Sequence, residues 1–439
     1  MGYNGTENFA PGKRFGLFPA YSLGWVPSRE LFFPKNAFVS FLKVRGSYGE
    51  VGNDNIGGTR FLYRPTSYSS ATNLYYFGNV GATYSGFSGV REGATGNPDV
   101  TWERAIKRNI GVEVWLWKDK IKFTGDVFDE NRSDILAVPQ TISAIAGLSQ
   151  PASNLGKMEN KGYEGDISYT DNIGQMGFRI GANYSFARNK VLFRDEVPNK
   201  YGYQNRTGQR LGQNYGLITE GIYNTWEEVN SASRPVYSYS NNKIQPGDLK
   251  YLDYNGDGII DDFDQVPIGY SNLPEKTFGA SLSMNYEGFD VSVLFQGVDN
   301  VSHYYTRFQR GTGYNQAPPE GSASYMNESW TPERYAAGLP INFPRFSVNS
   351  NPNTAGASFW LADARYLRIK NLEIGYKFSN NLLKKVAISS CRIYANANNL
   401  FTWKKTLPGI DPENTATGDV NSEPYPLTRT VNVGLNVNF

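Results

Sequence analysis

The sequence is poor in the residues on which most catalytic and metal sites depend. Its 439 residues include one Cys and one His. A single Cys excludes a disulfide framework and a thiolate metal cluster. A single His argues against a His-based catalytic triad or a zinc site, because both normally need several such partners. We therefore expect the chain not to be an enzyme.

The sequence also lacks an excess of one charge and a long apolar run. Lys and Arg number 43 against 41 Asp and Glu, which argues against a nucleic-acid partner. No stretch reaches the roughly 20 apolar residues of a membrane-spanning helix. Residues 1–8 have neither the basic start nor the apolar centre of a signal peptide. The protein is then either cytoplasmic or a chain without its true beginning, and the strand pattern decides between the two.

What the sequence does contain is aromatic residues, at 15%, and repeated period-2 alternation. In residues 430–439 every odd position from Val431 to Phe439 is apolar and every even position is polar or Gly. Such alternation predicts a strand with one apolar and one polar face. A change of phase after Ile369 predicts a bulge near Asn371. The pattern predicts about 11 strands, over residues 13–25, 38–50, 102–117, 120–131, 160–170, 176–188, 276–287, 289–299, 362–377, 388–401 and 427–439.

The predicted connections alternate in length. Short ones lie near residues 26–37, 118–120, 171–175, 287–288 and 378–387, and long ones near 51–101, 132–159, 189–275, 300–361 and 402–426. Long extracellular loops on one side and short periplasmic turns on the other are typical of an outer-membrane β-barrel, so we expect the long connections to face the cell exterior. Aromatic residues close to strand ends favour the same fold, because Tyr and Trp prefer the lipid–water interface. These are Trp25, Tyr48, Trp102, Trp115, Trp117, Tyr169, Trp360 and Trp403; the alternative is that they are core aromatics of a soluble β-sandwich.

Motifs along nearly the whole chain resemble those of SusC/RagA-type TonB-dependent outer-membrane transporters of Bacteroidetes. They include residues 9–25 (FAPGKRFGLFPAYSLGW), 42–49 (LKVRGSYG), 158–164 (MENKGYE), 246–248 (PGD), 363–371 (DARYLRIKN) and 398–401 (NNLF). The resemblance implies an all-β transmembrane antiparallel barrel of 22 strands, of which this chain holds about 11. It implies that residues 1–439 are the C-terminal part of the barrel, without the signal peptide, TonB box, plug domain and early strands. An odd strand number agrees with a partial barrel.

The same resemblance implies a function and partners. The intact protein would import oligosaccharides or peptides across the outer membrane, with a SusD-like lipoprotein over its mouth and energy from the TonB complex. Phe439, at the end of the last alternating segment, resembles the signal read by the barrel-assembly machinery; the alternative is an ordinary last strand. Cys391 lies on the apolar parity of its strand, where we expect it to face outer-membrane lipid.

Residues 253–264 (DYNGDGIIDDFD) match the template of a calcium-binding loop. Ca²⁺ prefers six to eight oxygen ligands, and a Gly permits the sharp bend of the loop. The predicted ligands are Asp253, Asn255, Asp257, the carbonyl of Ile259, Asp261 and Asp264, around Gly258. The last position is Asp rather than Glu, and the alternative is an Asx-rich turn without metal.

Aromatic and Arg side chains in two long loops are the predicted ligand contacts, since aromatic faces stack on sugar rings. They are Tyr75, Tyr76, Phe77, Tyr304, Tyr305, Arg307 and Arg310. The alternative is that they order the loops or face the lipoprotein. We expect His303, next to this group, to be a solvated loop residue.

Two other functions remain open at this point. A smaller porin-like diffusion channel predicts an even strand number and a signal peptide. A soluble secreted carbohydrate-binding β protein predicts strands packed against a second sheet. A hydrolase is the weakest option, because pairs such as Asp129 and Glu130 have no spacing that places two carboxylates across a substrate.

Overall fold

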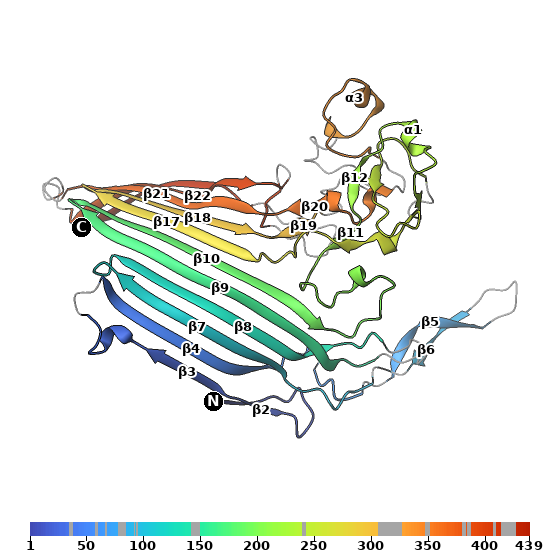
Figure 1. Ribbon diagram of the computed structural model, residues 1–439, viewed down its shortest axis with the longest axis horizontal. Helices are drawn as coiled ribbons and strands as arrows, with labels where there is room; N and C mark the ends of the chain where they lie inside the picture. The colour runs from blue at the N-terminus through green and yellow to red at the C-terminus, as the bar shows by residue number, and fades with distance from the viewer. Residues whose placement is uncertain are drawn as a thin grey trace.

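The fold is dominated by one curved antiparallel sheet (Figure 1). The computed structural model describes residues 1–34, 38–57, 60–65, 68–77, 85–91, 93, 95–141, 150–238, 243–305, 327–346, 352–379, 383, 388–406, 410–413 and 427–439, with 69–77, 85 and 91 described by their backbone alone. No helix in these segments is long and apolar enough to cross a membrane.

Eleven strands form the main sheet, and each pairs with its neighbour in the sheet order β3-β4-β7-β8-β9-β10-β17-β18-β21-β22-β23. Their bounds are β3 (Ala20–Trp25), β4 (Val39–Asn53), β7 (Glu103–Leu116), β8 (Ile121–Ala137), β9 (Ser153–Ile173), β10 (Met176–Phe193), β17 (Lys276–Tyr286), β18 (Phe289–Asp299), β21 (Tyr366–Lys377), β22 (Ser390–Lys404) and β23 (Thr430–Asn438). This confirms the predicted partial barrel of 11 strands. Strands of up to 21 residues, as in β9, far exceed the usual length in soluble sheets.

The cross-strand register gives the sheet two chemically distinct faces. Leu282 lies opposite Ile180 and Val293, and Ser283 lies opposite Arg179 and Ser292. Because side chains alternate along a strand, apolar residues gather on one face and polar residues on the other. We call these the apolar face and the polar face.

Short turns connect the main strands at one end of the sheet and long segments connect them at the other (Figure 1). The short connections are residues 26–38, 117–120, 174–175, 287–288 and 378–389, and the long ones are 54–102, 138–152, 194–275, 300–365 and 405–429. The predicted alternation is therefore confirmed. In the two-residue turn between β17 and β18, Glu287 and Gly288 both have positive φ, at 46° and 91°, as a type I′ hairpin turn requires.

The predicted bulge lies one residue before Asn371. Asn371 pairs with Leu294 and Ile369 pairs with Phe295, so Lys370 has no opposite residue in β18. The extra residue moves Leu372 and Ile374 onto the same face as Leu367 and Ile369.

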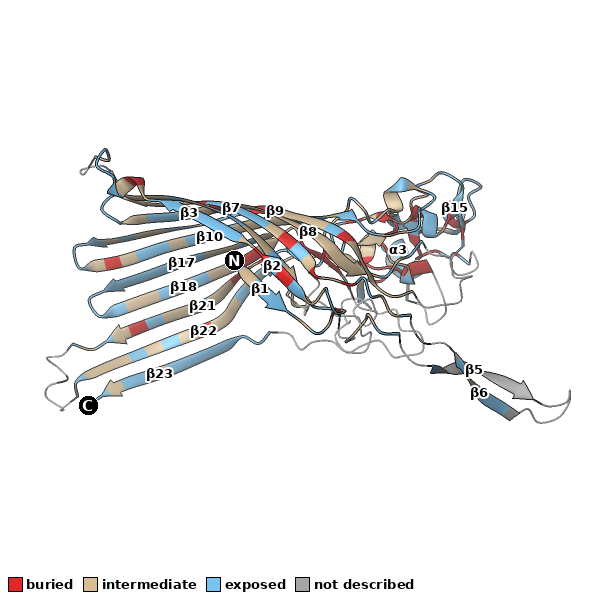
Figure 2. Ribbon diagram, turned by 90° about the horizontal axis from the view of Figure 1, so that it is seen from below, coloured by how far each residue is buried: buried red, intermediate tan, exposed pale blue. Residues whose placement is uncertain are grey.

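Buried residues gather at the end with the long connections, whereas the sheet itself is mostly intermediate or exposed (Figure 2). Short strands order these connections: β5 (Ser69–Phe77), β6 (Ser85–Arg91), β11 (Tyr215–Gly216), β12 (Thr219–Ile222), β13 (Val236–Tyr237), β14 (Leu249–Tyr251), β15 (Ile259–Ile260), β16 (Val266–Pro267), β19 (Ser302–Tyr304) and β20 (Leu361–Asp363). The helices there are single turns: α1 (Trp226–Val229), α3 (Pro332–Ala336), η3 (Gly202–Gln204), η5 (Asp262–Asp264), η6 (Pro352–Thr354) and η7 (Ser358–Trp360). At the opposite end lies η1 (Pro27–Arg29).

Two details of the sequence prediction are wrong. The predicted strand 13–25 is split, because β2 (Phe15–Phe18) pairs with β1 (Gly2–Gly5) and only β3 joins the main sheet. Trp102 and Trp360 do not belong to an interfacial belt. Trp102 packs edge-on against Phe18, and Trp360 is fully buried. Sequence position near a strand end could not distinguish a residue at the membrane surface from one covered by a loop.

Candidate functional site: the loop module

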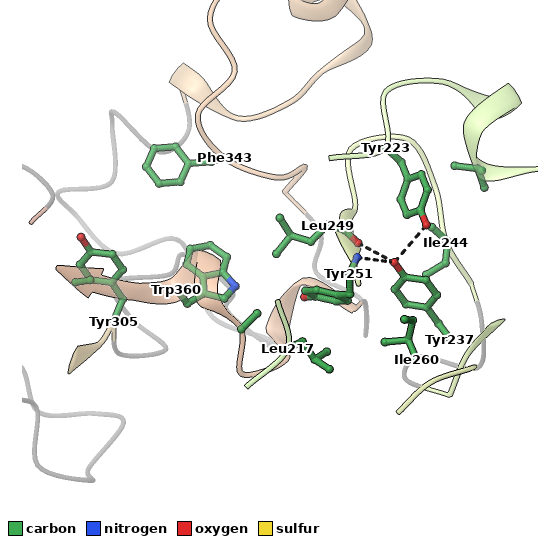
Figure 3. Packing of buried hydrophobic residues seen from close by; sticks show 13 residues of the cluster. Leu217, Tyr223, Tyr237, Ile244, Leu249, Tyr251, Ile260, Tyr305, Phe343 and Trp360 are labelled. Atoms are coloured by element: carbon green, nitrogen blue, oxygen red, sulfur yellow. Dashed lines mark hydrogen bonds between the residues drawn. The ribbon is translucent and has the colours of Figure 1, made fainter. Parts of the chain in front are cut away.

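Two long connections, residues 194–275 and 300–365, fold together into one unit, which we call the loop module. Its described residues share a hydrophobic core (Figure 3). Tyr251 and Leu249 come from the first connection and Trp360 from the second, and all three are at most 1% exposed. The indole of Trp360 donates to the backbone oxygen of Asn353 at 2.7 Å. The two connections therefore form one module and cannot be treated as independent loops.

Asp248 is the polar centre of this module and is fully buried. Arg345 donates to its carboxylate from Nε at 2.7 Å, and Asn353 donates from Nδ2 at 3.0 Å. The backbone N–H of Gln245 donates to the second carboxylate oxygen at 2.8 Å. A buried carboxylate is stable only when it is paired in this way. Asp248 thus joins the two connections to each other.

Glu275 joins the module to the sheet at the start of β17. Arg188 of β10 donates to both of its oxygens at 2.8 Å, Asn300 donates at 2.9 Å, and Arg210 of the module also donates to it. Burial alone would raise the pKa of the Glu275 carboxyl, but these hydrogen bonds outweigh burial and hold the pKa below its ordinary range. These charge-assisted hydrogen bonds therefore attach the loop module to the main sheet.

The predicted calcium loop lies on the outer side of the module and is closed by its own hydrogen bonds. Asp253 accepts from the backbone N–H of Gly256 at 2.8 Å and of Gly258 at 2.7 Å. Asp264 is fully buried and accepts from three backbone N–H groups; despite these bonds, burial raises its pKa. No three Asp, Glu, His or Cys side chains converge in a metal-binding group within the described part of the chain. Calcium binding therefore stays a prediction.

The predicted ligand contacts lie in different environments. Tyr305 is 8% exposed within the module core, and the hydroxyl of Tyr304 donates to the backbone oxygen of Tyr215 at 2.8 Å. Arg307 and Arg310 lie outside the described residues, as do the side chains of Tyr75, Tyr76 and Phe77, whose backbone belongs to β5. The role of all seven in ligand contact stays a prediction.

The prediction for His303 is wrong, because this side chain is 6% exposed rather than solvated. It lies in β19 opposite Ala362 of β20, and neither ring nitrogen has a hydrogen-bond partner among the described residues. Burial lowers its pKa and keeps the imidazole neutral. No sequence signal places a lone His in a two-strand ladder.

The module carries an open cleft on its surface, with a volume of about 830 Å³. Trp226 is 59% exposed at this cleft, with Glu227, Arg234 and Lys250 among its other lining residues. An exposed indole beside charged side chains can stack on a sugar or hold a peptide. None of these residues was predicted. They come from α1, the segment after it and β14, and no sequence motif links these three segments.

The polar face of the sheet carries interlocked ion pairs instead of a core. Arg45 of β4 pairs with Asp126 of β8 at 2.6 Å and with Glu113 of β7 at 3.5 Å. On the same face, near the opposite edge of the sheet, Arg392 of β22 pairs with Glu373 of β21 at 2.6 Å. Such a face suits a hydrated interior rather than packing against a second sheet.

The fold and this polar interior define the wall of an outer-membrane β-barrel. The model of the family "TonB dependent receptor-like, beta-barrel" matches residues 2–255, which is more than half of the chain. The chain therefore belongs to this family of receptors, which are not enzymes. As the sequence predicted, it is an outer-membrane chain, with its apolar face toward lipid.

Relatives match the chain from end to end. The TonB-dependent receptor P3 of Formosa agariphila is 27% identical over 462 aligned residues, and the TonB-dependent receptor SusC of Bacteroides thetaiotaomicron is 26% identical over 449. These matches cover 99–100% of this chain but 42–43% of the relatives, so the chain spans less than half of their length. The solved RagAB peptide transporter has the same fold, with a TM-score of 0.72 at 21% identity, over 98% of this chain and 44% of the other.

Proposed function

We propose that this chain forms the C-terminal wall and the outer loops of a TonB-dependent importer of oligosaccharides or peptides. The end-to-end match to SusC is the observation that carries the proposal, because it includes the long connections as well as the strands. In this proposal the ligand binds at the module and the polar face. The TonB complex acts through a part of the protein outside this chain.

The loop module supports a binding role because it is already folded by its own core. A site fixed before the ligand arrives loses less conformational entropy on binding. The exposed Trp226 and the charged residues around it offer contacts for a sugar ring or a peptide chain. We also propose that a SusD-like lipoprotein covers this end of the barrel, as the name RagAB implies a second component for that transporter.

Growth of the native strain tests the import function. Deletion of the gene should abolish growth on one class of a panel made of defined oligosaccharides and casein-derived peptides, and deletion of tonB should cause the same loss. No defect on any member of either class, or a defect that the tonB deletion does not share, would contradict the proposal. Affinity isolation of the intact protein from outer membranes should recover a lipoprotein in equal amount.

Calcium is a separate part of the proposal. Each carboxylate oxygen of Asp253 accepts one backbone N–H, which leaves acceptor capacity for a cation. Asp253, Asn255, Asp257, the carbonyl of Ile259, Asp261 and Asp264 would hold it. Isothermal titration of the intact protein with CaCl₂ should show binding that Asp257→Ala weakens at least tenfold, whereas Glu227→Ala in the same module leaves it unchanged. Equal heats for the wild type and Asp257→Ala would exclude the site.

A further inference from the structure

The apolar face of the sheet ends abruptly in a row of charged residues, on the side of the long loops. Two residues outward of an apolar position on each strand lie Arg108, Asp129, Lys161, Arg188, Lys276, Asp299, Arg365 and Lys405. The first four are cross-strand neighbours, as are Lys276 and Asp299, whereas Lys276 lies opposite Phe186 rather than Arg188. Arg365 and Lys405 adjoin the paired residues Tyr366 and Lys404. On each strand the residue two positions further inside the apolar face is Ile110, Val127, Tyr163, Phe186, Phe278, Gly297, Leu367 or Trp403, in the same order. The row holds six cations and two carboxylates, and Glu159, Glu275 and Asp363 pair with three of the cations, which leaves a net positive charge of one. We call it the basic row.

The height of the basic row follows from strand geometry. On β17 the apolar positions run from Tyr286 to Phe278, eight residues apart, and on β10 from Phe178 to Phe186. At about 3.4 Å per residue this is ~27 Å along the strand, or ~20 Å at the usual tilt of about 40°. This is close to the roughly 25 Å apolar band of an outer-membrane barrel. The next residue outward on the same face, a member of the basic row, therefore lies among the lipid headgroups of the outer leaflet.

A groove interrupts the apolar face directly beneath this row. It has a volume of about 430 Å³, and Phe278, Leu367 and Trp403 are among its lining residues. Gly297 lies between Phe278 and Leu367 in the cross-strand register. A Cβ at Gly297 would collide with the Phe278 ring, so the absence of a side chain lets that ring cover the position.

Cations stand at the upper end of the groove. Arg365 and Lys405 line it and are 48% and 62% exposed. Asp363 is their shared partner, at 2.6 Å from Arg365 and 3.8 Å from Lys405. Asp299 also lines the groove, but it is paired with Lys276 at 2.9 Å, so a net positive charge remains at this end.

We propose that this groove binds an anionic, phosphate-bearing lipid of the outer leaflet. The acyl chain lies along Phe278, Leu367 and Trp403, and the phosphate lies at Arg365 and Lys405. The two halves of the site match the two halves of such a lipid, at the depth where each belongs. The proposal concerns the lipid side of the wall and is independent of what the barrel imports.

Trp403 supplies the readout, because brominated acyl chains quench the fluorescence of an indole that they contact. The intact protein is placed in dioleoylphosphatidylcholine vesicles that contain either brominated phosphatidic acid or brominated phosphatidylcholine. The signal of Trp403 is the difference between the wild type and Trp403→Phe. We expect tighter binding of phosphatidic acid, by about fivefold for each cation. The double variant Arg365→Gln/Lys405→Gln should remove this preference.

The matched control is Arg108→Gln/Lys161→Gln. These two cations belong to the same row but lie on β7 and β9, away from the groove. It should leave the preference at Trp403 unchanged. Heat-modifiable migration in gels confirms that each variant barrel is folded. Equal quenching by both lipids in the wild type would overturn the proposal. An equal loss in the control and the test variant would also overturn it, because a diffuse surface charge would then explain the preference.

Discussion

The 11-stranded sheet, which forms the barrel wall, and the loop module both remove apolar side chains from water. The wall does so against lipid, and the module does so against its own residues. In the wall, Leu282 is 38% exposed and Val433 is 76% exposed, because their partner is lipid rather than protein. In the module, Trp360 and Leu249 are fully buried by residues of the same chain. The wall depends on the membrane and on its neighbouring strands, whereas the module has the core of a soluble domain. An exposed apolar side chain therefore marks a lipid contact in the wall, whereas a buried one marks the protein core of the module.

Removal of a core side chain should destabilise the module more than any other single substitution considered for the two regions. Trp360→Ala removes a fully buried indole and its bond to Asn353, and should lower the free energy of unfolding of the module by about 3–5 kcal/mol. Hydrogen exchange of residues 215–223 and 248–251 in the intact protein measures this. The control is Trp226→Ala, an exposed Trp of the same module, with an expected change within about 0.5 kcal/mol. Similar protection in both variants would show that the module has no core of its own.

A charge on the wall tests the opposite solvent. Leu282 is the central apolar position of β17, so Leu282→Arg should destabilise the folded barrel by about 2–4 kcal/mol. The adjacent Ser281 lies on the polar face, and Ser281→Arg should change stability by less than about 1 kcal/mol. Urea titration of the intact barrel, followed by heat-modifiable migration, compares the two. If both substitutions had the same effect, the assignment of the two faces would be wrong.

Acid should weaken the module and leave the wall unchanged. The folded pKa of His303 is lowered by burial, so the unfolded module binds a proton at a higher pH than the folded one. Module stability is therefore full above the ordinary pKa of about 6.5. Between that value and the lower folded pKa it falls by about 1.4 kcal/mol for each pH unit. Hydrogen-exchange protection factors of the module, which relate each rate to that of the unfolded chain at the same pH, measure this between about pH 7 and 5. His303 is the one His in the sequence, so His303→Phe should flatten the profile; an unchanged profile would assign the effect elsewhere.

The smallest expected effect concerns a single hydroxyl. Tyr304→Phe removes the 2.8 Å bond to the backbone oxygen of Tyr215 and should destabilise the module by about 1 kcal/mol. The same variant separates packing from ligand contact. A loss of ligand affinity with unchanged module protection would show that Tyr304 contacts the ligand, as the sequence predicts.

The sequence alone predicted the wall almost completely. Period-2 alternation located the strands, the two faces and the bulge beside Asn371, because each depends only on neighbours along one strand. The lengths of the connections likewise predicted that the short turns gather at one end of the sheet and the long connections at the other. The motifs 246–248 and 363–371 also marked residues that the structure shows to be buried or paired, among them Asp248 and Arg368.

The tertiary structure decided what the long connections do. Asp248 with Arg345, and Glu275 with Arg188, are pairs separated by 97 and 87 residues, and no local pattern links them. The burial of His303 and Trp360 likewise depends on two connections that fold against each other. Phe278, Leu367 and Trp403 line one groove only because β17, β18, β21 and β22 are neighbours in the sheet. Alternation depends only on residues that are neighbours in the sequence, whereas a core or a groove forms only where distant segments of the chain meet.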